Sequence, residues 1–283
     1  MKRIRSGRGL GDSVYLQSVV RHLIERDKTG FEVASDWPDV FIPLGDKVKV
    51  IPFTRDRIDI LAHYASRKAY DSTQFRDCCI NAGIDGLVEL KLDWPKPEGP
   101  KIDAMREDGK PVVVVGLPRA PMGRTDGFAL EVLPDCRVIQ KLIDKLGHDV
   151  TFVQVGAGKS LFDFRGLEFD FANRTTVKEL IDIVAAADAV IGYCSFLLAL
   201  AESLAKPAIM VWARAGLNSR QFYVRRIAPH KIIEHASTRF IIDDCGEYEV
   251  ERVLDGFLRP GAGWRILDRK EDMPGRQRAG IVG

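Results

Sequence analysis

The chain lacks long hydrophobic runs. Nowhere in its 283 residues do about 18 apolar side chains follow one another, as a membrane-spanning helix requires. The basic start, residues 1–7, is not followed by the apolar stretch of a secretory signal. We therefore expect a cytoplasmic protein with no transmembrane segment.

The chain also has few cysteines and histidines and almost no excess charge. The five cysteines are odd in number and show no paired Cys-x-x-Cys spacing, which argues against a disulfide framework and against a zinc site. The five histidines have no ligand spacing either, so no metal site is expected. With 42 basic and 40 acidic residues, the net charge of +2 provides no global attraction to nucleic acid or anionic membranes.

The composition that is present, 46% hydrophobic and 29% charged, is that of an ordinary folded protein long enough for two domains. Residues 94–100 hold three prolines and a glycine, which interrupt helices and sheet ladders and predict a linker. We predict an N-terminal α/β domain over residues 1–98, a C-terminal α/β domain over residues 99–262 and a polar tail over residues 263–283.

Strands and helices alternate most clearly after the linker. Thr176 and Glu179 form the capping-box pattern of a helix start. Such alternation with short connections predicts parallel sheets covered by helices, with ligands bound beyond the carboxyl ends of the strands. The predicted strands are 31–35, 48–53, 87–92, 112–115, 150–155, 189–192 and 207–212, and the predicted ligand loops of the C-terminal part are 116–125, 156–163, 192–196 and 213–220.

A glycine-rich turn, residues 9–13, precedes a helix predicted for residues 14–25. Glycines allow a ligand to approach the backbone, and a helix N-terminus attracts anions. The carboxylate of Asp12 within this turn has two interpretations. It either belongs to a ligand-binding turn or is the N-cap of an ordinary helix.

A second glycine turn, residues 156–160, ends in the Gly-Lys-Ser of a phosphate-binding loop. The first glycine of that motif would stand at position 153, which is Val153, and no long helix is expected to follow. A turn that lets a ligand approach the backbone is therefore favoured over a triphosphatase loop.

The Gly9–Ser13 turn, residues 175–192 and residues 201–212 together resemble the lipopolysaccharide heptosyltransferases of glycosyltransferase family 9. The resemblance implies the GT-B type of fold, two Rossmann-like domains facing across a cleft. It also implies inverting, metal-independent transfer of a sugar from a nucleotide-diphosphate sugar to an acceptor hydroxyl. The donor would be ADP-heptose-like or a hexose, the acceptor a saccharide or another hydroxyl compound, and no cofactor besides this co-substrate is implied.

The resemblance places Asp12 at the position of the general base. Arg119 and Arg124 lie in a loop that binds phosphate in the family, where a guanidinium offers two parallel hydrogen bonds to a diphosphate. A solvated loop charge is the alternative for each arginine. The residues expected to bind the donor are Gly9, Gly11, Arg119, Arg124, Thr125, Gly156, Gly158 and Ser195.

The chain departs from the family after Gly192. The family has Asp, Ser or Thr, Gly and, three residues on, His, whereas here only Ser195 matches. This departure predicts altered contacts to the donor phosphates. It would also suit a non-catalytic nucleotide-binding protein that retains the fold, which is one alternative function.

A basic and aromatic cluster supports another alternative, a glycosyltransferase acting on modified DNA bases. Arginines neutralise phosphates and aromatic rings stack on bases, so a nucleic-acid acceptor is compatible with this cluster. A solvated loop with two anchoring rings is favoured over nucleic-acid binding. The cluster consists of Arg214, Arg220, Phe222, Tyr223, Arg225 and Arg226.

Overall fold

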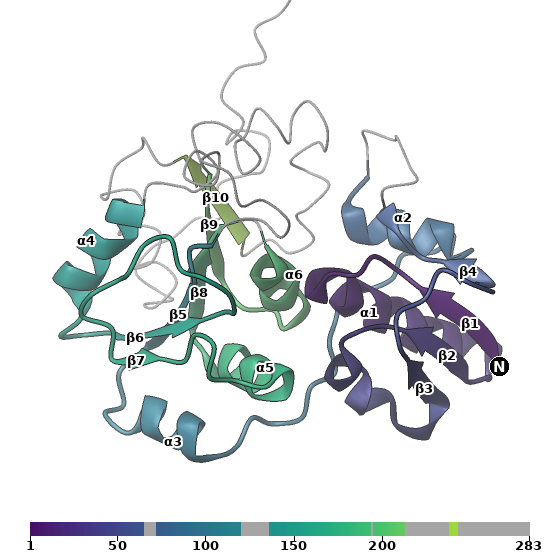
Figure 1. Cartoon of the computed structure of the whole chain (residues 1–283), viewed down its shortest axis with the longest axis horizontal. Helices are drawn as coiled ribbons and strands as arrows, with labels where there is room; N and C mark the ends of the chain where they lie inside the picture. The colour runs from purple at the N-terminus through teal and green to yellow at the C-terminus, as the bar shows by residue number, and fades with distance from the viewer. Residues whose placement is uncertain (65–71, 120–135, 194, 213–237, 243–283) are drawn as a thin grey trace, which may run out of the picture.

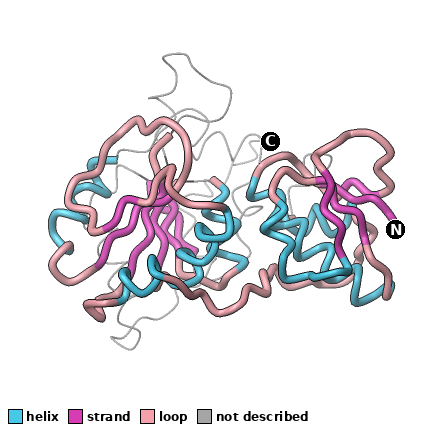
Figure 2. Tube along the Cα trace, turned by 60° about the horizontal axis from the view of Figure 1, so that its bottom comes forward, coloured by secondary structure: helices cyan, strands magenta, loops and turns pink. Residues whose placement is uncertain are grey.

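Two parallel sheets make up the protein, each with its own helices (Figure 1). The structure, a computed structural model, describes residues 1–64, 72–119, 136–193, 195–212 and 238–242. The first sheet has the strand order β3-β2-β1-β4 and the second β10-β9-β8-β5-β6-β7. Figure 2 shows the two groups of strands separated by helices. The predicted α/β class with parallel sheets is confirmed, while the domain boundary at residues 98 and 99 stays a prediction.

The first sheet is built around a charged strand. In β1, only Ile4 is fully buried. The Arg3 guanidinium is paired with Glu32 at 2.9 Å, and that of Arg5 lies 5.5 Å from the centre of the Phe53 ring, so both charges have partners. The elements of this half are β1 (Lys2–Arg5), α1 (Leu10–Asp27), β2 (Phe31–Ala34), the 3-10 helix η1 (Pro38–Lys47), β3 (Val48–Ile51), β4 (Ile60–Leu61) and α2 (Gln74–Asn81).

Helix α1 begins four residues earlier than the sequence predicts. Gly9 is its N-cap, with extended backbone (φ −71°, ψ 156°), and the helix starts at Leu10. Asp12 is therefore the third helical residue, and its Oδ2 accepts a hydrogen bond from the Gly9 N–H at 3.0 Å. This bond satisfies a backbone donor just before the first turn, which allows the glycine-rich segment to be helical.

Two expectations near the linker are wrong. Residues 87–92 form no strand. The Leu87 side chain is almost fully exposed, and the Leu92 N–H donates to the Ser203 carbonyl and not to a neighbouring strand. The alternating pattern had no neighbouring strand to pair with. Pro100, assigned to the linker, is instead the first residue of helix α3 (Pro100–Arg106), a position where the missing N–H of proline costs nothing.

The second sheet follows the predicted alternation closely. Strand β5 (Val112–Gly116) lies in the middle of the sheet, and its four valines are fully buried. Thr176 and Glu179 form the predicted capping box: the Thr176 N–H donates to Glu179 Oε2 at 2.8 Å and the Glu179 N–H to Thr176 Oγ1 at 3.2 Å. The remaining elements are α4 (Cys136–Leu146), β6 (Thr151–Val155), β7 (Phe169–Asp170), α5 (Val177–Ala186), β8 (Ala189–Gly192), α6 (Phe196–Ser203), β9 (Ala208–Trp212) and β10 (Thr238–Ile242).

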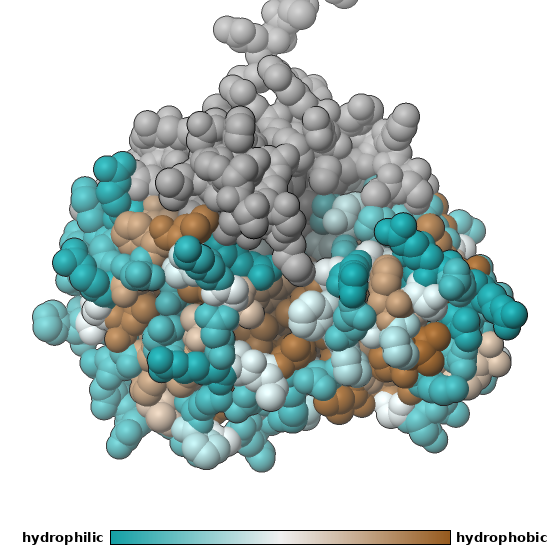
Figure 3. All heavy atoms as spheres, viewed as in Figure 1, coloured by the Kyte–Doolittle hydropathy of each residue, from teal (hydrophilic) through white to brown (hydrophobic). Residues whose placement is uncertain are grey.

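Helices α1 and α6 join the two halves (Figure 1). One hydrophobic core runs continuously from the first sheet through these helices to one face of the second sheet, whose other face packs against α4. Figure 3 shows a largely hydrophilic surface with hydrophobic atoms where the two halves meet. No helix in the described parts of the chain combines the length and hydrophobicity needed to cross a membrane.

Candidate functional site

Asp12 lies at the carboxyl edge of the first sheet, in the first turn of α1. Its side chain is 17% exposed, and its Oδ2 accepts the Gly9 N–H. The Tyr64 side chain also hydrogen-bonds to this carboxylate. The N-cap interpretation is thus wrong in its detail, because Gly9 is the N-cap, although the carboxylate does hydrogen-bond to the N-cap residue.

His63 faces Asp12 from the segment after β4. Its Nε2 lies 3.9 Å from Asp12 Oδ1, and its side chain is 24% exposed. A Cβ on Gly7 would lie 2.1 Å from Asp12 Oδ2 and 2.9 Å from His63 Nε2. Only a glycine at position 7 therefore leaves room for both side chains where they stand.

The environment shifts the pKa values of both groups. Burial raises the pKa of Asp12, against the opposing effects of His63, the Gly9 N–H and Tyr64. Burial lowers the pKa of His63, and the charge of Arg5 lowers it further, while the Asp12 carboxylate raises it. A carboxylate with a raised pKa is a stronger base than an ordinary aspartate, which suits the removal of a proton from a hydroxyl group.

The glycine turn after β6 requires its glycines. Gly156 and Gly158 have φ values of 135° and 118°, which side chains disfavour. Asn173 closes the turn: its Oδ1 accepts the Gly158 N–H at 2.7 Å and its Nδ2 donates to the Gly158 carbonyl at 3.0 Å. The residues after Ser160 form no helix, in agreement with the preference for a simple turn over a triphosphatase loop.

Arg119 connects this turn with the loops that follow β5 and β8. Its Nη1 donates to the Ala157 carbonyl at 2.7 Å, and its backbone N–H donates to the Tyr193 hydroxyl at 3.0 Å. The same hydroxyl donates to the Leu117 carbonyl, and burial raises the pKa of Tyr193 to about 12. Three of the predicted ligand loops therefore converge at the carboxyl edge of the second sheet.

The two edges meet where α1 lies against α6. Ser195 is the N-cap of α6 and accepts the Leu197 N–H at 3.3 Å. A Cβ on Gly11 would lie 3.2 Å from the Phe196 Cα, so this glycine brings the two helix starts together. Neither Gly9 nor Gly11 has a positive φ, so neither position requires the conformational freedom of glycine. A side chain is excluded there instead by close contacts, of Gly9 with Asp12 and of Gly11 with α6.

The remaining predicted residues lie outside the described part of the chain. They are Arg124, Thr125, the cluster between Arg214 and Arg226, the whole of the 213–220 loop and the tail over residues 263–283. Within the described residues, no group of three histidine, cysteine, aspartate or glutamate side chains is arranged to hold a metal ion.

Sequence reasoning missed His63, Tyr64 and Gly7 as parts of the site. No local pattern marks His63, because the pairing of β1 with β4, with Arg5 opposite Leu61, is what brings it near Asp12. Gly7 had a usable signal, since it precedes Gly9 in a Gly-x-Gly pattern.

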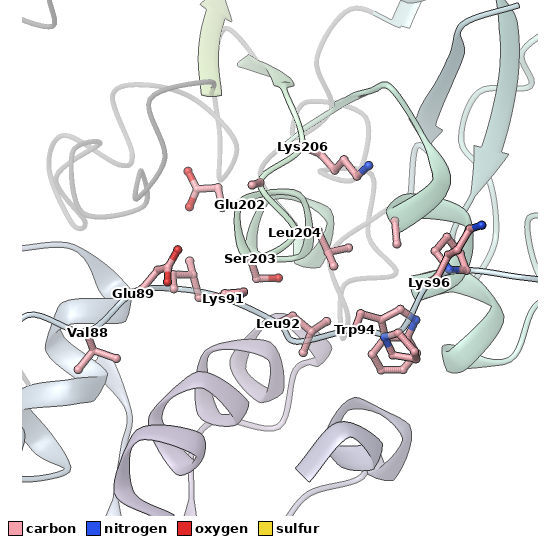
Figure 4. A pocket seen from close by; sticks show the side chains of 15 residues that line it. Val88, Glu89, Lys91, Leu92, Trp94, Lys96, Glu202, Ser203, Leu204 and Lys206 are labelled. Atoms are coloured by element: carbon pink, nitrogen blue, oxygen red, sulfur yellow. The ribbon is translucent and has the colours of Figure 1, made fainter. Parts of the chain in front are cut away.

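A cavity of about 450 Å³ lies at the opposite end of α6, between the 88–97 segment and the residues that lead into β9 (Figure 4). Leu92 and Trp94 line one side, and Leu204 and Lys206 the other. This is the amino end of β9, whereas ligands of parallel sheets bind at the carboxyl ends. The Asp12 and Arg119 edges are therefore the better candidate site.

No protein-family model matches the chain, and no curated protein matches its sequence. Solved structures do share its fold. ADP-heptose lipopolysaccharide heptosyltransferase II from E. coli aligns with a TM-score of 0.58 and 14% identity, over 91% of this chain and 98% of that one. A family 9 glycosyl transferase from Veillonella parvula aligns with a TM-score of 0.55 and 10% identity, over 94% of this chain and 92% of that one. E. coli heptosyltransferase WaaC with ADP aligns with a TM-score of 0.51 and 11% identity, over 77% of this chain and 89% of that one. At these identities the likeness shows the fold alone, an α/β fold shared with these glycosyltransferases, and the arrangement of two domains across a cleft stays a prediction.

Proposed function

We propose that this protein is an inverting glycosyltransferase that moves a sugar from a nucleotide-diphosphate sugar to an acceptor hydroxyl. The observation that carries the proposal is the Asp12 carboxylate, held at the carboxyl edge of one sheet beside the start of α6 in the other. The fold supports it, because similarly folded enzymes have names that describe heptosyl transfer, and one of them holds ADP. An ADP-linked heptose is accordingly the first donor to test.

In the proposed reaction the acceptor hydroxyl gives its proton to Asp12 as its oxygen attacks the anomeric carbon. The bond from that carbon to the diphosphate breaks, and the nucleoside diphosphate leaves with the electron pair. Attack opposite the leaving group inverts the configuration. Arg119 at the edge of the second sheet would stabilise the charge on the diphosphate without a metal ion. The proposal places the protein in the cytoplasm, where nucleotide sugars are available.

The test is Asp12→Asn, with Asp27→Asn at the other end of α1 as the matched control. ADP-heptose and other nucleotide sugars are first screened for thermal stabilisation of the wild-type protein, since specific binding raises apparent stability. Transfer or hydrolysis is then followed by release of the nucleoside diphosphate. We expect Asp12→Asn to lower turnover by about a hundredfold to ten-thousandfold, with donor affinity retained.

The asparagine Oδ1 can still accept the Gly9 N–H, so Asp12→Asn should fold without loss of stability. A large loss of thermal stability with proportionate loss of activity would assign Asp12 a capping role only. Binding of nucleotide sugars without any release of nucleoside diphosphate would instead support the non-catalytic nucleotide-binding alternative.

A further inference from the structure

His63 and Asp12 are separated by the width of one hydroxyl group. The 3.9 Å between His63 Nε2 and Asp12 Oδ1 is too long for a hydrogen bond between them. A hydroxyl oxygen placed about 2.8 Å from each atom would form good hydrogen bonds with both. Both side chains are partly exposed, so a ligand can reach this position.

The orientation of His63 is fixed by its surroundings. Its ring stacks on the Tyr64 ring, with centroids 4.5 Å apart and 30° between the planes. Its backbone carbonyl accepts a hydrogen bond from Asn81 Nδ2 of α2 at 2.7 Å. A fixed imidazole beside a fixed carboxylate is the arrangement that positions a reacting group.

Burial favours the neutral form of His63. Burial and the charge of Arg5, on β1, lower its pKa, whereas Asp12, on α1, raises it. Tyr64 stacks on the ring, and the buried Cys78 thiol of α2 has a strongly raised pKa, so it contributes no charge. A neutral imidazole has one N–H and one lone pair, which allows it to hydrogen-bond to a hydroxyl group without forming an ion pair with Asp12.

We propose that His63 is a second residue of the acceptor site, which holds the reacting hydroxyl together with Asp12. The His63 Nε2–H donates to a lone pair of the hydroxyl oxygen, and the hydroxyl donates its proton to Asp12. During transfer that O–H bond breaks, the proton moves to Asp12, and His63 keeps its own proton. This inference rests on the proposed glycosyl transfer for its chemistry.

The first test does not depend on activity. Histidine imidazoles labelled with ¹³C are titrated by NMR in the full-length protein, and the His63 signal is identified by its loss in His63→Gln. We expect the pKa of His63 to lie below that of an ordinary histidine and to fall further in Asp12→Asn, because the carboxylate charge is removed. An unchanged titration in Asp12→Asn would show that the two side chains are not coupled and would overturn the proposal.

The second test measures ADP release from ADP-heptose with glycerol as the acceptor hydroxyl. We expect His63→Ala to lower kcat/KM for glycerol about tenfold or more, with the affinity for ADP unchanged. His63→Gln should recover much of this loss, because its amide N–H can donate in place of the imidazole. His148→Gln, on the exposed surface after α4, is the matched control and should behave as wild type.

The pH dependence of activity distinguishes two roles of His63, orienting the acceptor hydroxyl and accepting its proton. As the pH falls, protonated His63 would pair with Asp12 and neutralise the base, so wild-type activity should decline through the pKa of His63. In His63→Gln this decline should move to lower pH. If His63→Gln is as inactive as His63→Ala, His63 itself takes the proton and the proposal is wrong. If the wild-type protein binds ADP-heptose but releases no ADP, the glycosyl-transfer proposal fails. The NMR titration still shows in that case whether His63 and Asp12 are coupled.

Discussion

Gly11 of α1 lies so close to α6 that a Cβ at this position would stand 3.2 Å from the Phe196 Cα. The contact is with backbone, which cannot turn aside as a flexible side chain can. It brings the helix turn that carries Asp12 next to the N-cap residue Ser195. The absence of a side chain at position 11 therefore allows the two halves of the candidate site to pack against each other.

Gly11→Val should destabilise the protein. The added methyl groups must push α1 and α6 apart, and overpacking of this kind costs about 1–3 kcal/mol. Urea denaturation measures the change in the free energy of unfolding. Gly86→Val is the control, because no atom lies within 4 Å of the position of its Cβ. Equal stability of the two variants would mean that α1 and α6 lie farther apart at Gly11 than the 3.2 Å distance indicates.

Gly7→Ala should lower turnover more than it lowers stability. Its Cβ would overlap the Asp12 carboxylate, at 2.1 Å from Oδ2, and the cheapest relief is rotation of the aspartate away from its position. We expect at least a tenfold loss of turnover, on the order expected for a misplaced catalytic group, with ADP affinity retained. ADP release and ADP binding are measured on the same samples, beside Gly86→Ala. Full activity in Gly7→Ala would argue against this position of Asp12 during catalysis.

Arg119→Ala should weaken binding of ADP more than binding of adenosine. A guanidinium contributes to affinity mainly through charge-assisted hydrogen bonds to the diphosphate, which adenosine lacks. Calorimetric titration with both ligands measures the difference. Arg165→Ala, an exposed arginine after Phe164, is the charge-matched control. A similar loss for ADP and adenosine would assign Arg119 to the structure of its loop and not to phosphate binding.

The ionisation of Asp12 should cost folding stability at neutral pH. Burial raises its pKa in the folded protein above the ordinary value of 3.8, so the folded state binds this proton more tightly than the unfolded state. The free energy of unfolding that Asp12 contributes is therefore highest at low pH and is lost as the pH rises through the folded pKa. Denaturation of wild type and Asp12→Asn across this range should show Asp12→Asn gaining stability relative to wild type as the pH rises. A constant difference would mean that the pKa of Asp12 is not raised.

Local patterns in the sequence determined the alternation of strands and helices in the second half. The valines of β5 and the Thr176–Glu179 capping box are recognisable because their signals lie within a few neighbouring residues. The same holds for the Gly-x-Gly-Asp turn, and its resemblance to the family 9 heptosyltransferases made Asp12 a candidate base. The 87–92 segment shows the limit of such patterns, because alternation forms a strand only where another strand is available for pairing.

Only the tertiary structure decided what surrounds these residues. His63 reaches Asp12 because β4 pairs with β1, and the Tyr193 hydroxyl connects Arg119 with Leu117 because β8 lies beside β5. The sequence by itself determined that a carboxylate would stand at a helix start. Its neighbours, and hence its raised pKa, depend on strand pairing and helix packing between segments far apart in the chain, which no local periodicity encodes.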